Sequence, residues 1–202
     1  MAVQYLAANR FGLGRRFDDP AIGNAKDWLT RQLGDYDPAP AALTGLAGRA
    51  AIATAYAEYR DERQAMRREA NEAAMPDSDD AMPEAMRRMA RAGFRRHYAD
   101  AAGARLAAAV ATPTPFAERL VHFWSNHFAV SADKQTVVGF AGNYENEAIR
   151  PHIMGKFSDL LTAAVHHPAM LLYLDQAQSF GPDSAFATRV RNRGNRQAPG
   201  LN

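Results

Sequence analysis

The stretch that decides the fold of this chain is TPFAERLVHFWSNHF, residues 114–128. Thr114 as N-cap and Pro115 at the first helical position predict a helix start. At 100° per residue the helix divides into two faces. One face is apolar and aromatic and carries His127, which we expect to be a hydrogen-bonded core residue. The opposite face carries four polar side chains, namely Glu118, His122, Ser125 and Asn126.

Glu118 and His122 are the first candidate site, because side chains four residues apart on a helix can meet. A carboxylate that holds an imidazole raises its pKa and fixes its tautomer, as in a general base with its orienting group. The same two groups are plausible metal ligands one turn apart. An ordinary surface ion pair is the third interpretation of this spacing, and the three remain open.

The second candidate cluster lies at a proline-stopped helix end. Glu145 and Glu147 lie about 200° apart on a helix, so both cannot point into one site. Arg150 could pair locally with Glu147 or Asn146, or clamp an anionic substrate. His152 directly follows the proline, on a turn from which its side chain can reach a cleft.

Two histidines and an aspartate form a third candidate cluster. His166 and His167 point about 100° apart on a helix, so at most one would join a given site. A histidine near a helix C-terminus interacts favourably with the helix dipole and needs no catalytic role. Asp175 follows an apolar turn, where it could cap the next segment or lie on a pocket floor.

The candidates that could form one catalytic site are Glu118, His122, Glu147, Arg150 and His152. His122 and His152 are the two that could ligate a divalent metal. No cofactor-binding residue is assigned, and the cofactor stays unknown apart from a possible divalent metal. The P-loop, the Gly-rich dinucleotide motif, H-E-x-x-H and the nucleophile elbow are all missing. The glycines and arginines of 11–16 could make an anion-binding nest, although a helix stop followed by a turn is favoured.

Helical signals dominate the rest of the chain, and no segment longer than four residues has strand periodicity. We expect helices over 2–10, from the Asp19–Pro20 cap to Gly34, over 41–74 and over 83–111. An acidic break at 76–80 separates the last two into a helical hairpin. After 112, a link at 137–141 precedes helices over 144–150, 156–166 and 168–174, and the sequence beyond Ser179 is loop-like.

These signals predict an all-α fold, an irregular multi-helix bundle with a long helical hairpin insertion. Residues 1–39 would pack on the core as N-terminal helices, and 40–111 would form the Ala-, Arg- and Glu-rich hairpin. Residues 112–180 would be the core helices, and 181–202 a loop or disordered tail.

Composition bounds the class of function. The chain has no cysteine, which excludes disulfides, thiolate metal sites and cysteine nucleophiles. Lys and Arg number 24 against 22 Asp and Glu, a balance that gives no electrostatic footprint for nucleic acid. No transmembrane-length run and no signal peptide are visible, so a cytoplasmic location is the default.

Several long runs resemble a bacterial protein family known as domain of unknown function 1800. The runs are NRFGLG at 9–14, TPFAERL at 114–120, HFWSNHF at 122–128, IRPH at 149–152, GKFSDLL at 155–161 and HPAMLLYLD at 167–175, with Tyr144, Glu147 and Gln178–Ser179. The resemblance covers 1–35 and 112–202. Residues 40–111 match nothing in it and are interpreted as a variable insertion.

The resemblance implies a predominantly helical protein of unassigned activity. Members are commonly exported and commonly encoded beside a sulfatase-like family, which puts the cytoplasmic default in doubt. Members also continue beyond residues 200–202 into a segment rich in Glu, Arg and His, so we expect this chain to be a fragment.

Two functions remain open. The first is a hydrolase-type enzyme whose His, Glu and Arg site is completed by the segment beyond this chain, with a small-molecule substrate of unknown kind. The second is a non-catalytic helical scaffold or assembly module with a protein partner. The enzyme hypothesis gains if the side chains of His122, Glu147 and His152 meet in a concave pocket, and fails if they are scattered.

Overall fold

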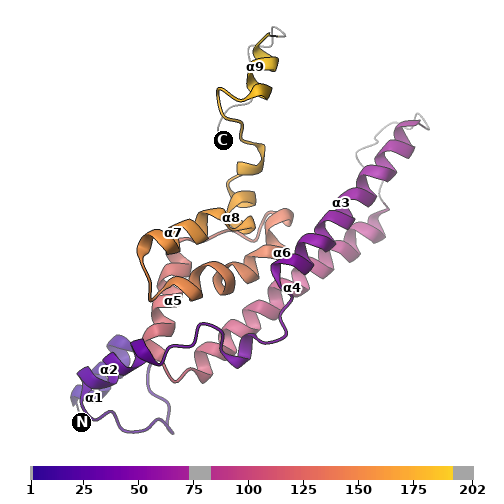
Figure 1. Cartoon of the computed structure of the whole chain (residues 1–202). Helices are drawn as coiled ribbons and strands as arrows, with labels where there is room; N and C mark the ends of the chain where they lie inside the picture. Colours follow the sequence, from indigo (N-terminus) through magenta and orange to yellow (C-terminus); the bar gives the residue numbers. More distant parts are fainter. Residues whose placement is uncertain (1, 73–82, 193–202) are drawn as a thin grey trace.

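The computed structural model describes residues 2–72 and 83–192, and within these ranges the chain is helical with no strand (Figure 1). The predicted all-α class is therefore confirmed. The elements are α1 (Ala2–Phe11), α2 (Ala25–Gly34), η1 (Ala41–Leu43), α3 (Arg49–Glu72), α4 (Glu84–Ala111), α5 (Pro115–His127), α6 (Gln135–Tyr144), η3 (Glu145–Ile149), η4 (Arg150–His152), α7 (Phe157–His166), α8 (Pro168–Tyr173), η5 (Gln176–Gln178) and α9 (Ala185–Asn192).

The two N-terminal helices pack beside the start of α5. The helix predicted to begin at Asp19 begins later, because Asn24 is the N-cap of α2 and its side chain accepts hydrogen bonds from the amides of Lys26 and Asp27. Asp19 instead accepts from the Arg16 amide at 2.7 Å and closes a turn. A carboxylate can serve a turn as well as a helix start, and the tertiary position of the chain decides between them.

The predicted hairpin corresponds to α3 and α4, which run side by side, with their far ends extending away from the other helices in Figure 1. Aromatic contacts join them, with the ring of Phe94 6.1 Å from that of Tyr56 and 6.3 Å from that of Tyr59. The acidic break predicted at 76–80 lies outside the described residues. Whether 40–111 is a separate insertion stays a prediction.

The core forms where α6 lies against α4. The segment 137–141 was expected to be a link, but it lies inside α6 and is buried. The glycines of α6 are contact residues: a Cβ at Gly142 would lie 2.5 Å from the Cβ of Ala101, and one at Gly139 would lie 2.9 Å from the Phe94 ring. Close helix contact therefore explains these glycines, which resemble helix breakers when only local propensity is considered.

The chain that follows α6 departs from regular α-helix. The predicted helix over 144–150 is a π-helix, η3, followed by the short 3-10 turn η4. Single π-turns inside helices are rare and occur often at functional sites. Helices α7 and α8 match their predicted positions closely.

The end of the described chain differs from expectation. The segment expected to be a loop contains α9, which projects beyond α8 in Figure 1. The rest of the expected tail, 193–202, lies outside the described residues. Of the helices in the described ranges, none combines the length and the hydropathy needed to cross a membrane.

Candidate functional site

Helix α5 buries the boundary between its polar and apolar faces. Glu118 is only 2% exposed, whereas Phe123 on the expected core face is 57% exposed. The buried direction centres on Val121, which lies on the helix between the two faces, so part of each is covered. The prediction for His127 is therefore wrong, because this residue is exposed and lies against the rings of Phe123, Trp124 and Phe128.

A buried arginine is the centre of the site. The guanidinium of Arg150 is fully buried and donates two hydrogen bonds to Glu118, one of them from Nη1 to Oε2 at 3.0 Å and the other from Nη2 to Oε1. Glu145 Oε1 lies 3.3 Å from Arg150 Nη2. Arg150 thus pairs with residues from α5 and η3, and neither predicted local partner, Glu147 or Asn146, binds it.

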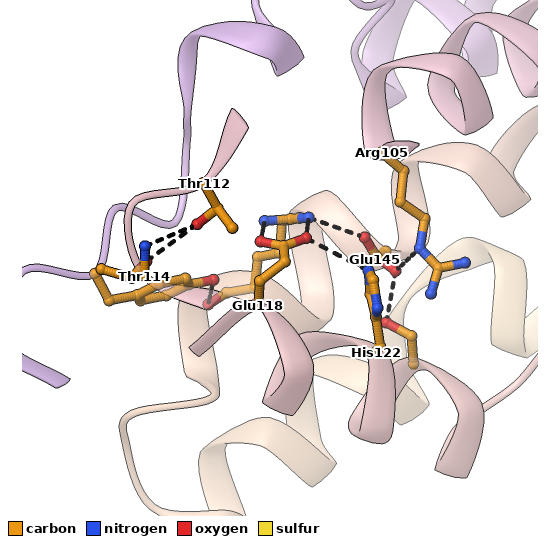
Figure 2. A network of polar contacts seen from close by, with 9 residues as sticks. Arg105, Thr112, Thr114, Glu118, His122 and Glu145 are labelled. Carbon is orange, nitrogen blue, oxygen red and sulfur yellow. Dashed lines mark hydrogen bonds and ion pairs between the residues drawn. The ribbon is translucent and has the colours of Figure 1, made fainter. Parts of the chain in front are cut away.

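His122 extends this network at the outer side of Glu118. Its Nε2 lies 3.5 Å from Glu118 Oε1, without hydrogen-bond geometry, and its side chain is 32% exposed. Figure 2 shows Glu118, His122 and Glu145 converging between α5 and η3. The expected contact between Glu118 and His122 is confirmed. Because the carboxylate of Glu118 is buried, the two residues do not form an ordinary surface ion pair.

The electrostatics of Glu118 follow from its partners. Burial alone would raise its pKa, but the contacts with His122 and Arg150 outweigh burial and hold the pKa of Glu118 below its ordinary value. Burial opposes the charge of Arg150 too, yet Glu118 and Glu145 raise the pKa of the guanidinium. Both groups are therefore charged at neutral pH, and Glu118 faces His122 as a carboxylate.

Glu145 connects the network to α4. Its Oε2 lies 2.8 Å from Arg105 Nε and accepts a hydrogen bond from the Ser125 hydroxyl at 2.8 Å. Figure 2 shows Arg105 on the far side of Glu145 from His122. Sequence reasoning missed Arg105 and gave Glu145 no role, because these contacts span separate helices and leave no local signal.

Tyr36 secures the backbone of the site from the N-terminal region. Its hydroxyl donates to the Arg150 carbonyl at 3.1 Å, and burial raises the pKa of Tyr36 to about 12. The phenol is therefore neutral and a donor at physiological pH. Four segments of the chain thus converge on Arg150 and its partners.

Glu147 belongs to a different cluster. It accepts from the Arg49 amide at 2.9 Å and from Asn143 Nδ2 at 3.3 Å, and its Oε2 lies 3.4 Å from His167 Nε2. Since Glu145 and Glu147 have different partners, the prediction that they cannot share one site agrees with the structure.

Among the described residues no contact joins Glu147 or His152 to His122, and neither lines the pocket beside His122, so these three side chains do not meet in one pocket. A site at His122 is therefore formed without Glu147 and His152, and the enzyme hypothesis in its five-residue form fails its own condition.

His152 lies in η4 and is partly buried. In the described part of the chain, no three His, Asp or Glu side chains are grouped so that they could hold a metal ion. The predicted metal ligands His122 and His152 therefore belong to no such group, and the metal site stays a prediction.

The two adjacent histidines differ, as their spacing required. His166 is exposed, with Nδ1 2.9 Å from the Thr162 carbonyl oxygen at the end of α7. His167 is buried and caps α8, with Nδ1 accepting from the Ala169 amide at 3.2 Å. Burial lowers the pKa of His167 although Glu147 opposes the shift, so the imidazole is a neutral structural cap.

Asp175 forms an ion pair across the fold. Its backbone has φ of 54°, and its Oδ2 lies 2.5 Å from Lys134 Nζ, which also donates to the Tyr173 carbonyl. No side-chain cap hydrogen bond is formed by Asp175 at η5. Of the two alternatives for Asp175, the side-chain cap is not formed, although the residue stands at the N-cap position of η5.

A pocket of about 740 Å³ opens beside His122. We call it the α2–α5 pocket, and it is formed by residues of 13–22, by α2, by the end of α4 and by the start of α5. Leu13, Trp28, Val110 and His122 are among the residues that line it. This volume lies within the range of small-molecule sites. The outer side of the Glu118–His122 pair thus faces a space large enough for a substrate.

The wall of this pocket depends on a turn and a cap. Gly14 has φ of 96°, a left-handed conformation that suits glycine and directs the chain from α1 into the pocket wall. Gln32, buried on α2, accepts from the Phe116 amide at 2.7 Å and so caps the N-terminus of α5. Sequence reasoning noted the glycine turn but missed Gln32, because this contact joins residues 84 positions apart.

Comparison with known proteins identifies the family and no individual relative. No curated protein and no solved structure matches the chain. The family model described as protein of unknown function DUF1800 matches residues 6–195, which is most of the sequence. The chain therefore belongs to the DUF1800 family.

Proposed function

We propose that this protein is an enzyme of hydrolytic type, with His122 as its general base and the α2–α5 pocket as its substrate site. The observation that carries the proposal is the position of His122, which lines a pocket of about 740 Å³ while a buried carboxylate stands 3.5 Å behind its Nε2. A carboxylate behind an imidazole orients the ring and stabilises the cation formed when the ring accepts a proton.

The roles of the network residues follow from their contacts. Arg150 is a positioning residue: it binds both oxygens of Glu118 and so fixes the carboxylate that orients His122. In this proposal Nε2 keeps its proton on the side of Glu118, 3.5 Å from Oε1, and Nδ1 acts as the basic nitrogen. It would take a proton from water as the water oxygen attacks an acyl carbon, and return that proton to the leaving oxygen as the ester bond breaks.

Hydrolysis of p-nitrophenyl butyrate by the full chain tests this proposal. His122→Ala should lower kcat/KM by about 100-fold or more, the usual contribution of a positioned general base. His166→Ala is the matched control, because His166 is exposed at the end of α7 and should leave the rate unchanged. A wild-type rate equal to that of His122→Ala, including no rate above buffer, would contradict ester hydrolysis at this site.

An assembly role is the second candidate, favoured by an aromatic patch on α5 and α7. The α5–α7 aromatic patch consists of Phe123, Trp124, His127, Phe128 and Phe157. Phe123 and Phe157 are 57% and 54% exposed. Contiguous exposed apolar groups often mark interaction surfaces. Sedimentation of the wild type and of a Phe123→Ser, Phe157→Ser variant tests this role, which predicts an oligomer for the wild type and a monomer for the variant.

A further inference from the structure

We infer that the α2–α5 pocket selects an organic anion: a carboxylate or phosphate group carried on an apolar body. This inference names the substrate class of the proposed hydrolytic site and so rests on the proposed function. It depends on two properties of the pocket wall, its apolar surface and its excess of guanidinium groups.

The apolar part of the wall comes from three segments. Leu13 and Ile22 lie in the segment between α1 and α2, Trp28 lies near the start of α2, and Val110 lies at the end of α4. Apolar lining with a few placed polar groups is the usual composition of a small-molecule site. A ligand with an apolar body would therefore be held by burial against these side chains.

The charged part of the wall is cationic. Of the described residues that line the pocket, three are arginines, namely Arg15, Arg16 and Arg31, and one is an acid, Asp19. Asp19 is already paired, because its Oδ1 lies 2.9 Å from Arg16 Nε. The Arg16 amide and guanidinium outweigh burial and hold the pKa of Asp19 below its ordinary value, so it stays charged and neutralises Arg16.

Arg16 has a structural role besides this pairing. It donates to the carbonyl of Val110 and, at 3.5 Å, to that of Thr112, so it ties the turn after α1 to the end of α4. A guanidinium with a carboxylate and carbonyl partners has little capacity left for a ligand. The arginine that holds the pocket wall together is therefore distinct from the arginines that could bind a ligand in the pocket.

Arg15 and Arg31 carry the uncompensated charge. Arg15 donates to the Asp19 carbonyl at 3.3 Å and lies over the Tyr5 ring, 5.2 Å from its centroid. Among residues 2–72 and 83–192, neither Arg15 nor Arg31 has a carboxylate within ion-pair distance. Arg31 follows Trp28 by three residues on α2, so the two share one face of the helix.

These groups define the chemistry of the ligand. Guanidinium binds carboxylate and phosphate through paired hydrogen bonds, and both remaining arginines line one apolar space with His122. Arg31 is exposed and Arg15 only partly buried, so both guanidinium groups are accessible to an anion, which supplies a charge partner that a neutral ligand lacks. We therefore expect esters that carry an anionic group to be preferred to neutral esters of the same size.

Binding can be measured at this pocket because Trp28 lines it and the chain has one other tryptophan, Trp124. A Trp124→Phe chain keeps Trp28 as its single tryptophan. Its emission is followed during titration with octanoate, octyl phosphate and octanol, whose alkyl chains differ by at most one carbon and whose head groups differ in charge. We expect octanoate or octyl phosphate to bind at least tenfold more tightly than octanol, and the stronger of the two identifies the anionic group.

An Arg15→Gln, Arg31→Gln variant in the same background should bind the preferred anion at least tenfold more weakly and octanol unchanged. Arg95→Gln is the matched control, an exposed arginine on α4 outside the pocket lining, and should bind as the parent does. Equal affinity for the anions and octanol in the parent, or undiminished anion binding in the double variant, would overturn the inference.

The same titration separates this inference from the proposed function. His122→Ala should retain anion binding within about threefold while ester hydrolysis is lost. If anions bind through the arginines but His122→Ala hydrolyses esters as the wild type does, the pocket inference stands and the catalytic proposal fails. If hydrolysis depends on His122 but charge does not affect binding, the reverse holds.

Discussion

Replacement of Arg150 by methionine tests the view that this residue organises the site. The side chain of Arg150 is fully buried, and those of Glu118 and Glu145 are 3% and 10% exposed. Arg150→Met keeps much of the side-chain volume but leaves two carboxylates without their shared cation. Glu145 retains Arg105 at 2.8 Å, so Glu118 is the group that loses its principal partner.

Removal of one partner from a buried ion pair costs about 3–5 kcal/mol of unfolding free energy. For a chain of this length each kcal/mol corresponds to about 2–4 °C in Tm, so the variant should unfold about 6–20 °C below the wild type. Urea and thermal unfolding followed by far-UV circular dichroism measure both quantities. Arg49→Met is the control: Arg49 is exposed and pairs with Glu147, and its loss should cost less than about 1 kcal/mol.

The pH dependence of the penalty gives a sharper check. In the wild type the pKa of Glu118 is lowered from 4.5, so Glu118 stabilises the fold above that pH and the contribution is lost as pH falls through the lowered pKa. Without Arg150, burial should raise the pKa of Glu118. Protonation of Glu118 then removes the uncompensated buried charge and with it part of the loss of stability. The penalty should therefore shrink between about pH 7 and about pH 5. A penalty under about 1 kcal/mol, or one that is the same at both pH values, would refute this reasoning.

Three further perturbations test the packing and the caps. Gly142→Ala should cost about 1–3 kcal/mol, because its Cβ would lie 2.5 Å from the Cβ of Ala101, whereas Gly103→Ala, with open space around it, should stabilise by up to about 1 kcal/mol in urea unfolding. His167→Asn keeps a capping acceptor but cannot titrate. The lowered pKa of His167 makes the wild type lose stability as pH falls below 6.5, so thermal unfolding of the variant should show a smaller loss over that range. An unchanged dependence of Tm on pH would contradict this reasoning. Gln32→Leu removes the acceptor for the first turn of α5 and should lower the unfolding free energy by about 1–2 kcal/mol.

Local signals in the sequence were sufficient for most helices and for one contact of the site. Pro115 and Pro168 each lie at the start of a helix, as expected from the fixed φ of proline. Glu118 and His122 meet because their separation of four residues fixes their geometry on any helix. Such features depend on a few neighbouring residues and are therefore readable from the chain.

Features that depend on residues far apart in the chain could not be predicted from the sequence. Arg150 binds Glu118 across 32 positions, so no local spacing indicated that pair. His127 was assigned to the core because it lies on the apolar face, but the face that is covered depends on where η3 and α6 pack. The glycines of α6 suggested a link for the same reason, since their role is contact with α4.

The hydrogen bond between Gln32 and Phe116 has a consequence for synthesis. The chain leaves the ribosome from its N-terminus, so α1 and α2 emerge well before the helix on which they pack. At about 5–20 residues per second, the 84 positions that separate the two residues take about 4–17 s to translate. During that interval the apolar side chains of the first two helices have no α5 surface to cover them. Nascent chains stalled before residue 116 should therefore bind chaperones that recognise exposed apolar segments, and longer ones should release them.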